Sequence, residues 1–242
     1  MIIKGVATVH DANLSEVSAG LYGGTAHGKA TVNWRKGVQL KGNLDVNRVE
    51  MHKIAPMLSF RTHVSGKPDA KAVWSASASS VSRLMNALRV ETPFSVHNGV
   101  LRGVDIQKAA TSLITQAATG GETHFDQLSG HLVMEHGSYC FTQLKIASGA
   151  LAADGDVTIS PKQELSGRIN AQVKALGTST GVPLNVAGTV DVPMLYPTSG
   201  TMAGAAVGTV ILGPGIGTSV GAKVGGWIEG LLGEQDEKKP KK

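Results

Sequence analysis

The stretch "LAADGDVTISPKQELSGRINAQV", residues 151–173, decides the fold because the polarity of its side chains alternates. In residues 151–159 and again in 165–173, apolar residues or glycine occupy every odd position, and the even positions are mostly polar. A period of two residues is that of a β-strand with one apolar and one polar face. Both segments are therefore expected to be strands of an antiparallel sheet that has solvent on one side.

The same alternation recurs along the chain. Further strands are expected at 26–32, 38–46 and 184–192, with weaker copies at 3–9 and 128–134. Each expected strand has a glycine on its apolar face: Gly5, Gly28, Gly42, Gly130, Gly155, Gly167 and Gly188. Glycine inside a strand marks a bulge, a bend or a close approach. We therefore expect an α+β fold over residues 1–198, in which a predominantly antiparallel, strongly curled, groove-like sheet carries a few short helices.

Three helices are expected in this domain, near 49–58, 79–88 and 105–118. Apolar residues at helical spacing define the second and third, with Ser79 or Ser80 and Asp105 as their N-caps. Tight turns are expected at three positions, Tyr22-Gly23-Gly24, Asn98-Gly99 and His136-Gly137.

Several classes of site are excluded by the short motifs. Gly23 and Gly28-Lys29 match most of a phosphate-binding loop, but Ala30 stands where a magnesium-ligating hydroxyl is needed, and residues 26–33 alternate as a strand does. A single cysteine, Cys140, excludes an internal disulfide and zinc sites with several thiolates. The net charge of +5 is modest, and basic residues are not interleaved with aromatic ones as in nucleic-acid-binding proteins. No cofactor, metal, nucleotide or nucleic acid is expected.

No arrangement of residues in the sequence indicates catalysis. Residues 123–126, "THFD", place a histidine near a carboxylate, but a pair of this kind arises readily by chance. Motifs of serine hydrolases and zinc proteases are absent from the sequence. We therefore expect a protein that is not an enzyme.

Residues 192–222 contain no charged residue, and glycines recur there and just beyond at every fourth position. The two arrays are Gly200, Gly204 and Gly208, then Gly217, Gly221 and Gly225. Such spacing on a helix lets two backbones approach closely. A hairpin of two helices is therefore expected over 199–233, either in contact with a membrane or docked on the end of the sheet, and a flexible glycine-rich loop is the alternative. The charged residues 234–242 are expected to be a disordered tail.

Several segments in order resemble the AsmA family. They are "FSVHNGVLRGVDIQKAA" (94–110), "ETHFDQLSGHLVMEHG" (122–137) and "VPLNVAGTVDVPMLYP" (182–197), with "LYGG" (21–24), Ala55-Pro56 and the glycine-rich end in support. The resemblance implies a bacterial envelope protein of the periplasm and inner membrane, similar to bridge-like lipid transfer proteins. It also implies a part in phospholipid movement or outer-membrane assembly. The N-terminal membrane anchor of the family is expected to be missing from this chain.

The apolar faces of the strands supply the candidate site. The pattern alone favours a sheet whose inner side is filled by its own side chains and helices, whereas the resemblance favours an open groove for phospholipid acyl chains. The groove candidates are Leu40, Leu44, Leu151, Val157, Ile159, Leu165, Ile169, Val173, Leu184, Val186 and Val190. The alternative function is a structural or protein-interaction domain of an envelope assembly complex with a filled, lipid-free core. An envelope hydrolase is a third candidate, which would need a polar cluster in a pocket.

Overall fold

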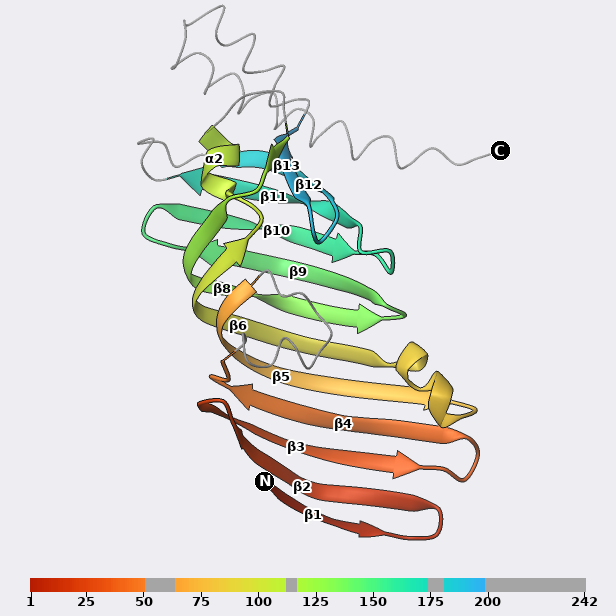
Figure 1. Ribbon diagram of the computed structural model, residues 1–242. Coiled ribbons are helices and arrows are strands. Elements are labelled where there is room, and N and C mark those ends of the chain that lie inside the picture. Colours follow the sequence, from red (N-terminus) through yellow and green to blue (C-terminus); the bar gives the residue numbers. More distant parts are fainter. Residues whose placement is uncertain (51–63, 112–116, 174–180, 199–242) are drawn as a thin grey trace, which may run out of the picture.

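The computed structural model describes residues 1–50, 64–111, 117–173 and 181–198, which form one large β-sheet (Figure 1). Within these ranges the sheet has 13 strands in the order β1-β2-β3-β4-β5-β6-β8-β9-β10-β11-β12-β13-β7, and neighbouring strands are antiparallel. The strands are β1 (Ile2–Ala7), β2 (Asp11–Leu21), β3 (Gly24–Asn33), β4 (Val38–Asn47), β5 (Val64–Ala78), β6 (Arg89–Arg102), β7 (Ala118–Thr119), β8 (Glu122–Glu135), β9 (Ser138–Ala147), β10 (Leu151–Ile159), β11 (Leu165–Val173), β12 (Val182–Gly188) and β13 (Pro193–Pro197).

The alternating segments of the sequence are strands, as predicted. β10 and β11 have the predicted bounds, and β4 and β3 extend only slightly beyond theirs. The prediction of one strand over 184–192 is wrong in its second half. β12 ends at Gly188, whose φ of +84° begins a turn, and the backbone N–H of Thr189 then donates to the carbonyl of Val192.

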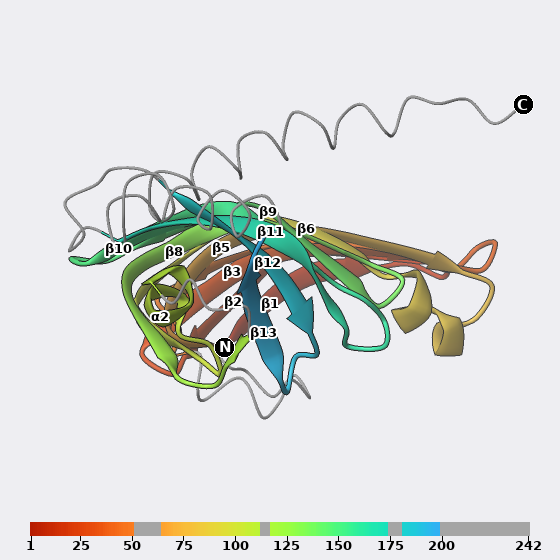
Figure 2. The same cartoon turned by 90° about the horizontal axis from the view of Figure 1, so that it is seen from above.

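The sheet arches and twists (Figure 2), but it is not strongly curled, which corrects the sequence-based expectation. The strand glycines serve other purposes. Gly5, Gly130 and Gly155 lie at breaks in the pairing register, where a bulge adds a residue to one strand. Gly42 makes room instead: a methyl group there would overlap the ring of Trp74 and the carbonyl oxygen of Lys29. The glycines thus adjust local twist and packing without closing the sheet on itself.

Two of the three predicted turns are present. Tyr22 and Gly23 have positive φ between β2 and β3, and His136 and Gly137 have positive φ between β8 and β9. The hairpin predicted at Asn98-Gly99 is wrong, since β6 continues through it. Asn98 has a φ of +51° there and lies opposite the register break of β5, so the same left-handed preference forms a bulge inside a strand.

Of the three predicted helices, two fall mostly on described residues, and neither has the predicted extent. The segment 79–88 forms two 3-10 turns, η2 (Val81–Arg83) and η3 (Met85–Ala87), and Ser80 precedes η2 without a side-chain cap. Of the helix predicted over 105–118, the structure shows α2 (Ile106–Thr111), and residue 118 already belongs to β7. The helix predicted at 49–58, apart from its first two residues, lies outside the described residues. So do the glycine hairpin of 199–233 and the tail of 234–242.

The main core lies at the C-terminal end of the sheet, where α2 packs on β11, β12 and β13 (Figure 2). Ile106, Ala109 and Ala110 of α2 are buried in one cluster with Leu184 and Ala171, both of which have no exposed surface. A smaller cluster lies beside it on β6 and β8. The described part of the sheet therefore has a filled end, and α2 contributes to its core.

Replacing Gly42 with alanine is expected to destabilise the sheet by about 1–3 kcal/mol, because Trp74 or the backbone of β3 must move. Gly20→Ala is the matched control, since no atom lies within 4 Å of an added methyl group there. Its effect should stay within about 0.5 kcal/mol. Urea denaturation of both variants measures the difference, and equal effects would contradict the packing role of Gly42.

Leu184→Ala is expected to lower the free energy of unfolding by about 2–5 kcal/mol, because it leaves a cavity under α2. Leu44→Ala, on the half-buried part of the apolar face, is expected to cost about 1–2 kcal/mol. Denaturant titrations of the two variants compare the filled and open parts of the sheet. A larger loss for Leu44→Ala would show that the main core is misplaced.

Candidate functional site

One face of the sheet is apolar over most of its length. Residues paired across antiparallel strands lie on the same face, so a row of pairs traces that face from strand to strand. From β2 to β11 one row consists only of apolar residues, aromatic residues and glycine: Leu14, Ala30, Gly42, Trp74, Val90, Met134, Tyr139, Ile159 and Leu165. No charged side chain interrupts this row, which we call the apolar row.

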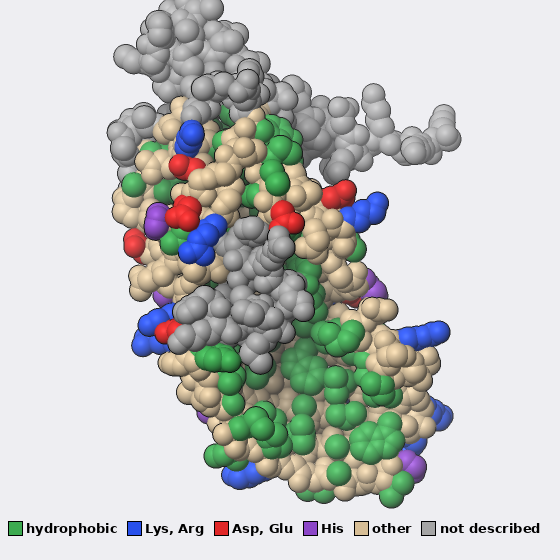
Figure 3. Space-filling view, viewed as in Figure 1, with side chains coloured by type: hydrophobic (Ala, Val, Ile, Leu, Met, Phe, Trp, Pro, Cys, Tyr) green, Lys and Arg blue, Asp and Glu red, His purple; other side chains and the backbone are tan. Residues whose placement is uncertain are grey.

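The apolar row is only half-buried. All of its members have intermediate exposure, including the bulky Trp74 and Met134. Figure 3 shows apolar side chains gathered over the N-terminal strands, with lysines and arginines around the margins of this lower part of the face. Among the described residues, the helix on this face is α2, and it covers the C-terminal strands.

The predicted groove residues therefore fall into two groups. One group is half-buried: Leu40, Leu44, Val157, Ile159, Leu165, Val186 and Val190. The other group belongs to the buried core around α2: Leu151, Ile169, Val173 and Leu184. Val157 and Val186 lie at the border, packed against that core, and Val190 lies in the turn after β12. The second group packs against α2 and the neighbouring strands. These residues therefore belong to the hydrophobic core.

Side-chain hydrogen bonds hold α2 in place. The Asp105 carboxylate accepts a hydrogen bond from the backbone N–H of Lys108 at 2.8 Å, which confirms the predicted cap. The hydroxyl of Thr123 on β8 accepts from the N–H of Ile106 at 3.0 Å and donates to the carbonyl of Val104 at 2.9 Å. Thr123 is only 4% exposed, so these bonds are shielded from water and fix the start of α2 to the sheet.

Aromatic side chains on the apolar face were not among the sequence candidates. Trp74 lies in β5, and Phe94 of β6 meets Phe141 of β9 edge to face with ring centroids 6.1 Å apart. Burial raises the pKa of Tyr139 above the ordinary tyrosine value, as expected beside apolar neighbours. The alternation of alanines around Trp74, over residues 70–78, is the signal that could have identified β5 as a strand of this face.

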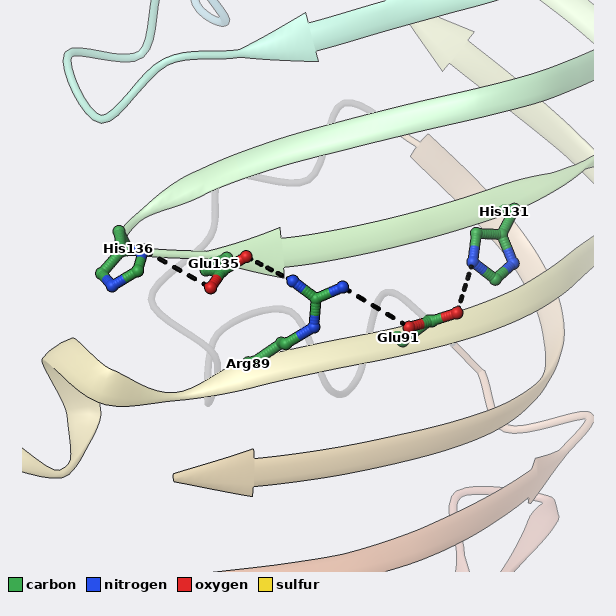
Figure 4. Close-up of polar contacts among 5 residues, drawn as sticks. All are labelled: Arg89, Glu91, His131, Glu135 and His136. Carbon is green, nitrogen blue, oxygen red and sulfur yellow. Dashed lines mark hydrogen bonds and ion pairs between the residues drawn. The ribbon is translucent and has the colours of Figure 1, made fainter. Parts of the chain in front are cut away.

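The opposite face is polar and carries exposed ion pairs. Arg89 contacts Glu91 at 3.6 Å and also pairs with Glu135 (Figure 4). His131 lies 3.3 Å from Glu91, and His136 lies 3.7 Å from Glu135. Exposed pairs of this kind contribute about 0–1 kcal/mol each. They form a solvated surface, and the two faces of the sheet differ sharply in chemistry.

The motifs that suggested phosphate binding and catalysis lie on strands. Lys29 is on the polar face of β3, and its backbone N–H donates to the side chain of Asn43 at 3.2 Å. His124 and Asp126 of β8 are exposed, and His124 is 3.8 Å from Glu122. In the described part of the chain, no group of histidine, cysteine and acidic residues is arranged to hold a metal ion. Within the same residues, no helix is both long and apolar enough to cross a membrane.

Comparisons with known proteins give one match. No curated protein and no solved structure matches the chain. The AsmA family model matches residues 8–144, which include β2 to β8 and most of β9, and this is more than half of the 242 residues. The similar segment at 182–197 lies beyond the matched range. Proteins of this family are associated with the bacterial envelope, and the chain belongs to the AsmA family.

Proposed function

We propose that the apolar row binds the acyl chains of phospholipids, and that the protein takes part, without catalysis, in phospholipid transport or outer-membrane assembly. The observation that carries this proposal is the uninterrupted, half-buried row from Leu14 to Leu165. Membership of an envelope-associated family supports it. The periplasm, at the inner membrane, is the proposed location.

The chemistry of the row suits a hydrocarbon chain. An acyl chain has no hydrogen-bonding groups, and the side chains of the apolar row offer only two, the hydroxyl of Tyr139 and the indole N–H of Trp74. Covering apolar surface is favourable by about 25 cal/mol per Å². Contiguous apolar surface on a soluble domain usually marks a binding site. The polar face, with Arg89 and Glu135 among its exposed ion pairs, would remain in water.

The filled end gives the proposed groove a boundary. The cluster around α2 includes Leu151, Ala171 and Leu184 at 2%, 0% and 0% exposure, so a hydrocarbon chain has no room there. An acyl chain would therefore contact the half-buried group of predicted residues, including Leu40 and Leu44. We further propose that the glycine-rich segment of 199–233 contacts the membrane, because it carries no charged residue up to residue 222.

A second candidate function is favoured by the same filled end. Because α2 shows that a polypeptide segment can cover this face, a partner protein could cover the rest of it. The protein would then be a structural or protein-interaction domain with a lipid-free interior. The two functions predict different molecules on the apolar row, and covalent cross-linking can separate them.

Placing the photo-reactive residue p-benzoylphenylalanine at Leu40 is expected to give phospholipid adducts on irradiation in bacterial cells, because Leu40 is on the apolar face. Gln39, its neighbour on the exposed polar face, is the matched control and should give none. Mass spectrometry of the purified protein identifies the adducts. Protein adducts alone at position 40 would favour the second function, and lipid adducts at both positions would contradict a face-specific site.

Leu44→Asp is expected to reduce co-purified phospholipid severalfold, because it places a charge within the apolar face. Val73→Asp is the control. Val73 is 62% exposed and is paired with Asn43 on the opposite face, one strand away. Lipid is measured by mass spectrometry after gentle purification, with circular dichroism to show that both variants fold. Equal lipid content in the two folded variants would count against the apolar row as the binding surface.

A further inference from the structure

A cavity of about 840 Å³ lies beside α2, at the border between the filled end and the open part of the sheet. Its walls come from β6, the start of β8, the exposed side of α2 and the turn between β9 and β10. Phe125 and Leu151, which are both buried, line it together with charged side chains. Its volume falls within the range of sites for small ligands.

The cavity exists because β8 extends beyond β9. β8 pairs with β6 from residue 122 onward, whereas its pairing with β9 begins only at Gln127, opposite Ala147. The chain then turns at 148–150 into β10, and α2 lies on the other side of the space. The cavity therefore results from the different lengths of β8 and β9, and it does not depend on the position of one side chain.

The cavity adjoins apolar surface that leads to the apolar row. Phe125 is buried in a cluster with Val96 and Leu128, and Phe94 and Leu144 pack against this cluster. Phe94 and Leu144 are themselves half-buried. A molecule with its hydrocarbon part on this face could therefore place its polar part in the cavity.

The charged groups of the cavity are not equally available. Asp105 caps α2, and Glu122 is paired with Arg102 at 3.4 Å and with His124 at 3.8 Å. The carboxylate of Asp126 and the ammonium group of Lys108 have no ion-pair partner among the residues that the structure describes. The residues that line the cavity thus include one carboxylate and one ammonium group outside these ion pairs.

We propose that this cavity binds the zwitterionic phosphoethanolamine headgroup of a phospholipid, with the ammonium group against Asp126 and the phosphate against Lys108. The inference rests on the proposed function, because it assigns the headgroup of a lipid whose acyl chains lie on the apolar face. An anionic phosphoglycerol headgroup would satisfy Lys108 but leave Asp126 beside a negative ligand. The site therefore prefers a headgroup that carries both charges.

The test uses the full chain and vesicles that contain equal amounts of phosphatidylethanolamine and phosphatidylglycerol. Bound lipid is extracted after gel filtration, and mass spectrometry gives both its total amount and its composition. The unmodified protein is expected to enrich phosphatidylethanolamine about threefold, the preference that one exposed ion pair can supply. Asp126→Asn is expected to abolish the enrichment without lowering total lipid, whereas Lys108→Gln, which removes a contact to the phosphate that both headgroups carry, is expected to keep the enrichment. Asp45→Asn and Lys41→Gln, exposed on the polar face of β4, are the matched controls and should keep it.

The outcomes separate this inference from the function on which it rests. Lipid that binds without enrichment, or enrichment that survives in Asp126→Asn, would overturn the headgroup site and leave the apolar row intact. Failure of the folded protein to bind any lipid would overturn both. A further arm adds soluble glycerophosphoethanolamine, which has the headgroup but no acyl chains. Loss of enrichment at unchanged total lipid in this arm would support the cavity as a headgroup site.

Discussion

The pairing register of the sheet is the constraint on which the rest of the structure depends. Because side chains alternate, a slip of one residue between two strands would move one strand's apolar side chains to the polar face. Breaks in register do occur, for example beside Gly5 and at Gly130. After each break the apolar residues return to the same side, so the bulges bend the strands without interrupting the apolar row. One apolar surface results from many separate pairings.

The two ends of this surface have different physical roles. At the C-terminal end, α2 removes side chains such as Leu184 from water, and this burial supplies a main core. Toward the N-terminal strands, Leu40, Leu44 and Trp74 stay half-exposed among the described residues. A domain that stabilises one end of its sheet can leave the other end available for a ligand. The proposed function needs both conditions, since an unstable sheet could not hold an open apolar face.

Most strands could be predicted because their signal is local. In β10 and β11 the alternation fixes both the element and the side that faces the core. The same local reasoning misplaced the hairpin at Asn98-Gly99, because a left-handed residue serves a turn and a bulge equally well. It also could not divide the predicted groove residues into exposed and buried groups. Ile169 and Leu44 have similar surroundings in sequence, and only the distant α2 makes one of them a core residue.

Uniform chemistry along the apolar row favours movement over tight binding. Neighbouring strands are about 4.8 Å apart, so a row from β2 to β11 extends roughly 40 Å. Every position along it lacks a charge, and a hydrocarbon chain would gain little by stopping at one of them. A preferred position requires a polar feature, and the cavity with Lys108 and Asp126 lies where the open surface meets the filled end. An apolar surface along which a lipid can move, with one polar cavity beside it, could transfer a lipid and also hold it briefly in one orientation.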